Sequence, residues 1–133
     1  MEIFIFGDRL LSELQDEFQA SYPYLKMVFS WKRGSDNKHE VLPDTRESYI
    51  TLAEISRKNL KGFITIEDHT ILNQLMKLFE SEFDLSVSFL HFTESDWISA
   101  NDVAEATLGE LNEQGRISFH RVHNVAVKPD HLL

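Results

Sequence analysis

Apolar and polar residues follow two different rhythms in the first part of the chain. Between residues 8 and 22, apolar side chains recur every three or four positions, which is typical of an amphipathic helix. They are Leu10, Leu11, Leu14, Phe18 and Tyr22. A β-rich run at 3–6 precedes this helix, Asp8 offers a side-chain cap, and Pro23 ends it because proline disfavours helical backbone in the preceding residue. From 25 to 29 every second residue is strongly apolar, which predicts a strand with one buried face.

The next residues are polar up to a second, shorter helix. The stretch 34–37 indicates the tip of a turn, and Val41–Leu42 a brief returning strand. Thr51 and Glu54 form a capping box, in which each side chain bonds a free backbone amide of the other residue. The pattern predicts a short helix that begins at Thr51 and ends before Asn59, a residue that tolerates left-handed backbone.

This pattern recurs in the second half of the chain. Without a gap, residues 3–22 align with 64–83, so that Phe18 meets Phe79. With two short gaps the alignment continues at 24–29 over 84–89 and at 41–55 over 97–111. The second half should therefore hold a strand at 63–66, a helix at 70–83, a strand at 85–92 and a helix from Leu108.

Each half also closes with the same helix-start signal. Thr107 and Glu110 repeat the capping box at the matching positions, and Gly115 lies as far beyond it as Asn59 does in the first half. Two amphipathic helices can share their spacing by chance, whereas a repeated capping box is a separate coincidence. We therefore expect two diverged repeats, at about 1–60 and 61–116, followed by a C-terminal extension at 117–133.

A strand–helix–strand unit used twice is the layout of the split βαβ, or ferredoxin-like, sandwich. The sequence thus predicts a single α+β domain over 1–133, with both long helices on one face of a four-stranded antiparallel sheet and extra short helices at its edges. Two tandem lobes, each with its own small sheet, are the alternative, although each lobe alone would be marginal in size. The tail at 117–127 is open to a helix or to an added edge strand.

Composition narrows the class of protein. The 133 residues are 42% hydrophobic and include ten Phe, which excludes a disordered chain. The absence of cysteine removes disulfides, thiol catalysis and Cys-based metal sites. No apolar run is long enough to span a bilayer, and the opening residues do not form a signal peptide, so we expect a cytoplasmic protein without membrane contact.

Negative charge is concentrated in the second half. Eight basic and ten acidic side chains leave −2 over 1–60, whereas five and twelve leave −7 over 61–133. A solvated face explains such a distribution, and so does a docking surface for a basic protein. For the second interpretation the predicted contact residues are Glu94, Asp96, Trp97, Glu105 and Glu110.

Metal binding and catalysis find little support in the motifs. His120 and His123 are three residues apart and are weak candidates for metal ligands, without the intervening Glu of the zinc-protease helix. Asp68 is better explained as a cap of the second long helix than as part of a cluster with Glu67 and His69. No nucleophile elbow, phosphate loop or dinucleotide fingerprint is present, so we assign no catalytic residue and no cofactor.

Nucleic-acid binding is a further alternative, because ferredoxin-like sheets can stack bases on aromatic side chains of their open face. The basic cluster at 57–61 is small, and the net charge of −9 opposes a polyanion. The aromatic residues are more simply explained as core. The candidates for stacking would be Phe4, Phe6, Phe29, Trp31, Phe89 and Phe92.

Several strings of the chain are similar to those of a group of small bacterial proteins of unknown function. They are LQDEFQASYPYLKMVF, TLAEI, FDLSVSF and TLGELNEQG, and the resemblance extends to about Arg116. These motifs are caps, core positions and turns, so the resemblance implies a fold and no activity, ligand or catalytic residue.

The sequence as a whole favours a non-catalytic protein-binding or regulatory module that uses an acidic surface or a sheet edge. Homodimerisation fits, because ferredoxin-like sheets expose edge strands and one apolar face. The alternative is a small enzyme or metal-binding protein that uses His and carboxylate groups.

Overall fold

The chain forms an α+β structure with two antiparallel sheets, described by a computed structural model at residues 1–33, 38–41 and 49–127. In chain order the elements are β1 (Glu2–Phe6), α1 (Leu11–Ser21), β2 (Leu25–Arg33), β3 (Lys38–Val41), α2 (Leu52–Ile55), β4 (Lys61–Thr65), α3 (Leu72–Phe83), β5 (Ser86–Thr93), β6 (Asp96–Ser99), the 3-10 turn η2 (Asn101–Val103) and α4 (Leu108–Val127).

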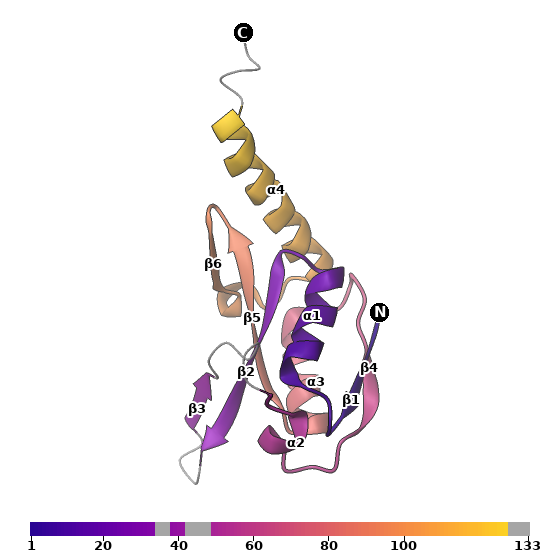
Figure 1. The fold of residues 1–133 in the computed structure, drawn as a ribbon. Coiled ribbons are helices and arrows are strands. Elements are labelled where there is room, and N and C mark those ends of the chain that lie inside the picture. The colour runs from indigo at the N-terminus through magenta and orange to yellow at the C-terminus, as the bar shows by residue number, and fades with distance from the viewer. Residues whose placement is uncertain (34–37, 42–48, 128–133) are drawn as a thin grey trace.

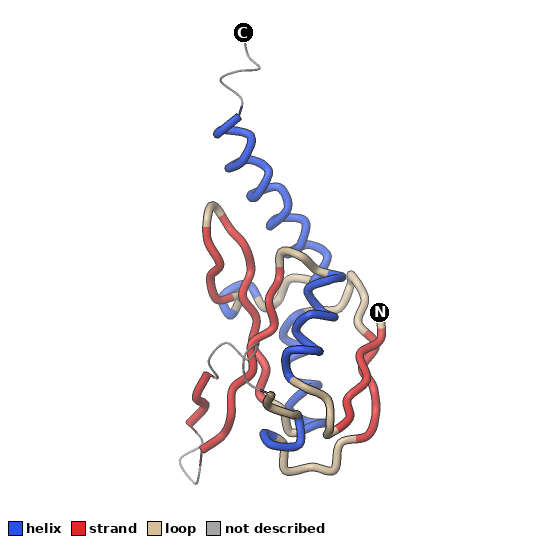
Figure 2. Tube along the Cα trace, viewed as in Figure 1, coloured by secondary structure: helices blue, strands red, loops and turns tan. Residues whose placement is uncertain are grey.

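The two sheets differ in size and lie on opposite sides of the long helices. One sheet has two strands, β1 and β4, and the other has four in the order β3–β2–β5–β6. Helices α1 and α3 lie between the sheets (Figure 1). Helix α4 begins beside them and extends past the β5–β6 hairpin, as Figure 2 shows. The β1–β4 sheet therefore has one face toward the helices and one toward solvent.

One hydrophobic core joins both sheets to the helices. Helix α1 buries Leu11, Leu14 and Phe18, and α3 buries three residues of the same type at the same spacing. Phe18 contacts Phe89 of the other half, with ring centroids 5.2 Å apart. The halves thus share one interior, and the alternative of two separate lobes is wrong. The largest fully buried side chains are Phe18, Phe29, Phe79 and Phe89.

In each sheet, one pair of positions that align between the two halves lies directly opposite. Ile3 pairs with Ile64 in the small sheet, and Val28 pairs with Ser88 in the large one. Backbone contacts around the helix starts are also matched. The Leu11 amide donates to Ile50 O at 3.0 Å and the Leu72 amide to Ala106 O at 3.1 Å; the Ala53 and Gly109 amides donate to Gly7 O and Asp68 O, each at 2.9 Å.

The ferredoxin-like grouping of strands is wrong. That fold places all four main strands in one sheet, whereas β1 pairs with β4 and β2 with β5 in two different sheets. The alternation in a strand predicts which of its faces is buried, and it does not specify the partner strand. Here the long helices lie between the two pairs, so β1 and β4 cannot reach the larger sheet.

The predicted helix ends at Asp8, Asn59 and Gly115 are also wrong. Helix α1 begins at Leu11, and the amide of the preceding Leu10 donates to Glu13 Oε1 at 3.1 Å. Helix α2 already ends at Ile55. Gly115 lies inside α4, where an added Cβ would be 2.5 Å from Tyr24 Cβ. This glycine allows α4 to approach the sheet closely, and no helix end is involved.

Residues 117–127, for which the sequence allows a helix or an edge strand, are helical, since they form the second half of α4. The returning strand is confirmed in part, because β3 pairs with β2 up to Val41, opposite Ser30. The predicted turn at 34–37, and Leu42, lie outside the described residues.

Candidate functional site

The outer face of the two-stranded sheet is built from the residues of β1 and β4 that point away from the core. In β1 the burial alternates, with Ile3 and Ile5 fully buried and the intervening residues exposed. The outward phenylalanines are 47% exposed at Phe4, 39% at Phe6 and 55% at Phe63. The interpretation of Phe4 and Phe6 as core is therefore wrong, whereas Phe29 and Phe89 are core.

These three rings form one continuous cluster. Phe4 stacks on Phe6 with centroids 6.1 Å apart, and it contacts Phe63 across the strands at 6.0 Å. The pairing puts Glu2 opposite Thr65 at one end of the face and Phe6 opposite Lys61 at the other. We call this outer surface the aromatic face: Glu2, Phe4, Phe6, Lys61, Phe63 and Thr65.

The hydrogen-bond pattern shows where the backbone of the aromatic face points. The Met1 amine donates to Ile66 O at 2.7 Å and the Ile66 amide to Met1 O at 2.8 Å, so this is a hydrogen-bonded pair. Hydrogen-bonded and non-bonded pairs alternate in an antiparallel ladder, so Phe4 and Phe63 are a non-bonded pair. Their backbone N–H and C=O groups therefore point away from the partner strand, toward the two edges of the sheet. Arg9 Nη1 donates to Phe4 O at 3.0 Å and covers part of that edge of β1.

Arg9 is itself held in place by two carboxylates. Its guanidinium lies 3.0 Å from Glu17 and 3.4 Å from Glu13. These contacts, led by the hydrogen bond to Glu17, raise the pKa of Arg9, and the hydrogen bond from the Leu10 amide lowers the pKa of Glu13. The edge of β1 is thus occupied by a fixed side chain, which leaves the aromatic face as the more accessible part of this sheet.

A second candidate is an open groove between the β5–β6 turn and α4, with a volume of about 730 Å³. Glu94 occupies the turn in the left-handed conformation (φ 57°), and Ser118 Oγ donates to its carbonyl at 3.2 Å. The groove combines one acid and one base with hydroxyl, amide and apolar side chains. It is lined by Thr93, Glu94, Ser95, Gln114, Ile117, Ser118 and Arg121.

The predicted partner-binding residues are found in two places. Glu94 lines the groove, and Asp96 and Trp97 follow it on β6, where Asp96 Oδ1 accepts from the Trp97 amide at 2.8 Å. Glu105 and Glu110 instead flank the start of α4. Glu105 accepts a hydrogen bond from Asn73 Nδ2 at 3.5 Å, and the Glu110 amide donates to Thr107 Oγ1 at 3.2 Å. Whether these five contact a partner stays a prediction.

The histidines whose side chains the structure describes lie on different segments of the chain. His120 is exposed on α4 with its ring 5.9 Å from that of Phe119, and the side chain of His123 lies outside the described residues. His69 Nε2 lies 2.9 Å from Glu67 Oε2. His91 is 8% exposed, and burial lowers its pKa. Within the described part of the chain, no group of three or more His, Cys, Asp or Glu could hold a metal ion.

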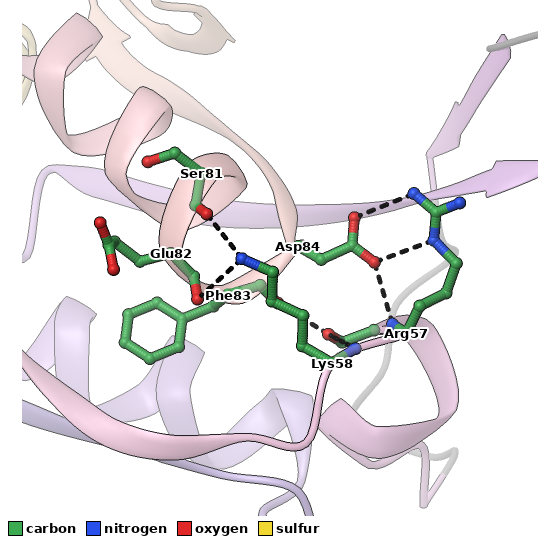
Figure 3. Close-up of polar contacts among 7 residues, drawn as sticks. Arg57, Lys58, Ser81, Glu82, Phe83 and Asp84 are labelled. Atoms are coloured by element: carbon green, nitrogen blue, oxygen red, sulfur yellow. Dashed lines mark hydrogen bonds and ion pairs between the residues drawn. The ribbon is translucent and has the colours of Figure 1, made fainter.

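Two positively charged residues of the small basic cluster are engaged at the end of α3. Arg57 Nε lies 3.1 Å from Asp84 Oδ2, and Lys58 Nζ donates to Ser81 O at 2.7 Å (Figure 3). Cations at a helix C-terminus satisfy its free carbonyls and favour its dipole. Arg57 and Lys58 thus stabilise the contact between the segment that follows α2 and the C-terminal end of α3.

The sequence does not predict the hydrogen bond between Tyr22 and Asp68. Tyr22 Oη donates to Asp68 Oδ1 at 3.0 Å, and burial followed by this bond raises the pKa of Tyr22. Asp68 does not cap α3, because the N-cap residue is Ile71. The residues are 46 apart in sequence, and no local pattern could pair them.

In comparisons with family models, curated proteins and solved structures, nothing matches the chain. Among the described residues, no helix has the length and apolar character that crossing a membrane requires.

Proposed function

We propose that the chain is a non-catalytic protein-binding module that docks through its aromatic face. The observation that supports this most directly is the cluster of Phe4, Phe6 and Phe63, which are 39–55% exposed and in which the Phe4 ring contacts the other two. The largest contiguous apolar patch on a protein surface is often functional. Aromatic side chains are also enriched in protein interfaces.

The buried, inward-facing residues of β1 and β4 support the same interpretation. Ile3, Ile5 and Ile64 already anchor the sheet to the core from its inner side. The outward phenylalanines are therefore not needed to hold β1 and β4 in place. A threonine or lysine at these positions would suit a solvent-facing strand, so an aromatic cluster there is better explained by binding.

A non-catalytic role agrees with the ionisable groups. Among the described residues, those with shifted pKa values belong to ion pairs, as with Arg57 and Arg116, or to buried positions, as with Tyr22 and His91. Catalytic groups with shifted pKa values usually converge in a cleft. The groove at α4 has one acid and one base, Glu94 and Arg121, without such a convergence.

The chain is further inferred to be an internal duplication, supported by the equivalent pairs Ile3–Ile64 and Val28–Ser88 and by the matched amide bonds at both helix starts. The duplicated arrangement places β1 and β4 side by side and so brings Phe4 next to Phe63. A cytoplasmic location, and binding by the acidic residues of the second half, remain predictions from the sequence.

Site-specific crosslinking in the native host tests the proposed function. A photoreactive phenylalanine analogue replaces Phe63, and in a control chain it replaces Ile98, which is similarly exposed (46%) on β6. We expect a covalent protein adduct from position 63 and none from position 98. Equal labelling from both positions, or none from position 63, contradicts docking through the aromatic face.

A further inference from the structure

We infer that the partner of the aromatic face is a second copy of this chain, packed face to face about a two-fold axis. This inference rests on the proposed function, since it names the protein that covers the same surface. It is based on the position of the charges around the rings.

Charge and apolar surface are arranged on the aromatic face so that it is complementary to itself. The rings of Phe4 and Phe63 occupy the middle row, Glu2 lies at one corner, and Lys61 lies at the diagonally opposite corner. A two-fold axis that lies in the interface, runs through the centre of the middle row and is perpendicular to the line from Glu2 to Lys61 exchanges these two corners. Glu2 of each copy then meets Lys61 of the other, while the rings pack on each other.

This geometry is one that sheets commonly adopt. Two sheets packed face to face keep their mean strand directions within about 30° of each other, and the axis perpendicular to the Glu2–Lys61 diagonal likewise makes the strands of the two copies cross obliquely. A two-fold interface uses the same surface patch twice, as required here. Edge-to-edge pairing through β1 is less suitable, because Arg9 occupies the Phe4 carbonyl at that edge.

The area indicates a reversible dimer. At exposures of 47%, 39% and 55%, the three rings offer about 280 Å² if a whole side chain counts as roughly 200 Å². A standard interface buries about 800 Å² on each partner. The rings would form its centre, and Glu2, Lys61 and Thr65 lie at the rim. We therefore expect association that depends strongly on concentration.

The experiment is a charge exchange, followed by analytical ultracentrifugation of the full chain with any tag placed after Leu133. The variants Glu2→Lys and Lys61→Glu each place like charges at both contacts. We expect each alone to weaken self-association about tenfold, because two rim ion pairs are lost and replaced by repulsion. An equimolar mixture of the two restores opposite charges at both contacts, and we expect it to recover association as a heterodimer.

A polar substitution at the centre completes the test. Phe63→Ser should weaken the dimer about a hundredfold, since it removes one central ring from each copy. Ile98→Ser, on β6, is the matched control and should leave association unchanged. The proposal is overturned if the parent chain is a monomer at every concentration, if the mixture associates no better than its components, or if Phe63→Ser has no more effect than the control.

The crosslinking experiment keeps the two proposals distinguishable. An adduct from position 63 with twice the mass of the chain supports the homodimer. An adduct with a different protein, combined with a monomeric parent chain, overturns the homodimer and leaves the proposed function standing. The lack of any adduct from position 63 contradicts the proposed function itself.

Discussion

The solvent-facing sides of the two sheets are built differently. On the four-stranded sheet, Ser88 and Ser99 alternate with half-buried apolar residues, and Trp97 is itself half-buried, with two partners within the chain. Lys26 Nζ lies 4.3 Å from the Trp97 ring centroid, and the Phe92 ring lies 5.5 Å away from it. On the two-stranded sheet, three phenylalanines contact mainly one another and solvent.

This difference separates aromatic residues that complete the fold from those that are available for binding. Trp97 has a cation and an aromatic edge against it, which are partners that a lone chain can supply. Phe63 is 55% exposed, and its ring neighbour Phe4 is itself 47% exposed. The cluster of exposed aromatic rings is thus on the smaller sheet, and the predictions below test that contrast.

Neighbouring residues of β4 provide the strongest test. Ile64→Ala should lower the free energy of unfolding by about 2–5 kcal/mol, because Ile64 is 2% exposed and its loss leaves a cavity in the core. Phe63→Ala should change it by roughly 0.5 kcal/mol or less under dilute conditions, as at other surface sites. Urea denaturation at low protein concentration measures both. Equal losses would mean that Phe63 is a structural residue and would remove the contrast between the two faces.

The sequence predicted much of the architecture, because local spacing controls helices, strands and their buried sides. The positions of Leu14, Phe18 and Phe79 in the core followed directly from the helical period. Sheet membership did not follow, since alternation in β1 does not identify its partner strand. The continuous apolar run at 3–6 predicts a buried strand and so places Phe4 and Phe6 in the core; because four of the five residues in EIFIF are apolar, polarity does not distinguish the two faces that the structure shows.

The same limit applies to contacts between distant residues. Gly115 resembled a helix end because glycine is common there, yet its reason is the approach of Tyr24, 91 residues earlier in the chain. The candidate site likewise depends on the pairing of Phe4 with Phe63. Spacing within one element cannot show such a juxtaposition, although the internal similarity of the two halves indicates that equivalent strands could meet.

Helix α4 packs at the end of the four-stranded sheet, and Gly115 tests how closely. Gly115→Val should destabilise the chain by about 1–3 kcal/mol, because its Cβ would fall 2.5 Å from Tyr24 Cβ and 3.3 Å from Phe92 O. Gln114→Val, at the exposed neighbour, controls for the helix propensity of a β-branched residue. Thermal unfolding of both variants gives the comparison. Similar melting temperatures would show that stability does not depend on the close contact of Gly115 with Tyr24 and Phe92. Helix α4 would then cover the end of the larger sheet less tightly than the structure indicates.

A hydrogen bond tests how firmly the two-stranded sheet is joined to the helices. Tyr22→Phe removes the donor to Asp68, which follows β4, and should reduce stability by about 1 kcal/mol at neutral pH. The folded state raises the pKa of Tyr22, so above the ordinary tyrosine value only the unfolded state readily loses this proton. The parent chain should consequently lose part of this stability as the pH rises above about 10. The Phe variant should not show this pH-dependent loss of stability. Tyr24→Phe is the control, and an identical loss in both variants would contradict a special role for the Asp68 bond.

The smallest expected effect concerns Trp97, the half-buried tryptophan on the larger sheet. Lys26→Met keeps the aliphatic stem and removes the charge over the Trp97 ring, so it should lower the free energy of unfolding by about 0.5–1 kcal/mol. Lys77→Met on the exposed side of α3 is the control for a lost surface charge in a chain of net charge −9. Urea denaturation followed by tryptophan fluorescence compares the two variants. If Lys26→Met lowers the free energy of unfolding no more than Lys77→Met does, the Lys26 ammonium does not stabilise Trp97. The Trp97 ring would then resemble the phenylalanines of the aromatic face, because it would lack a stabilising cation within the chain.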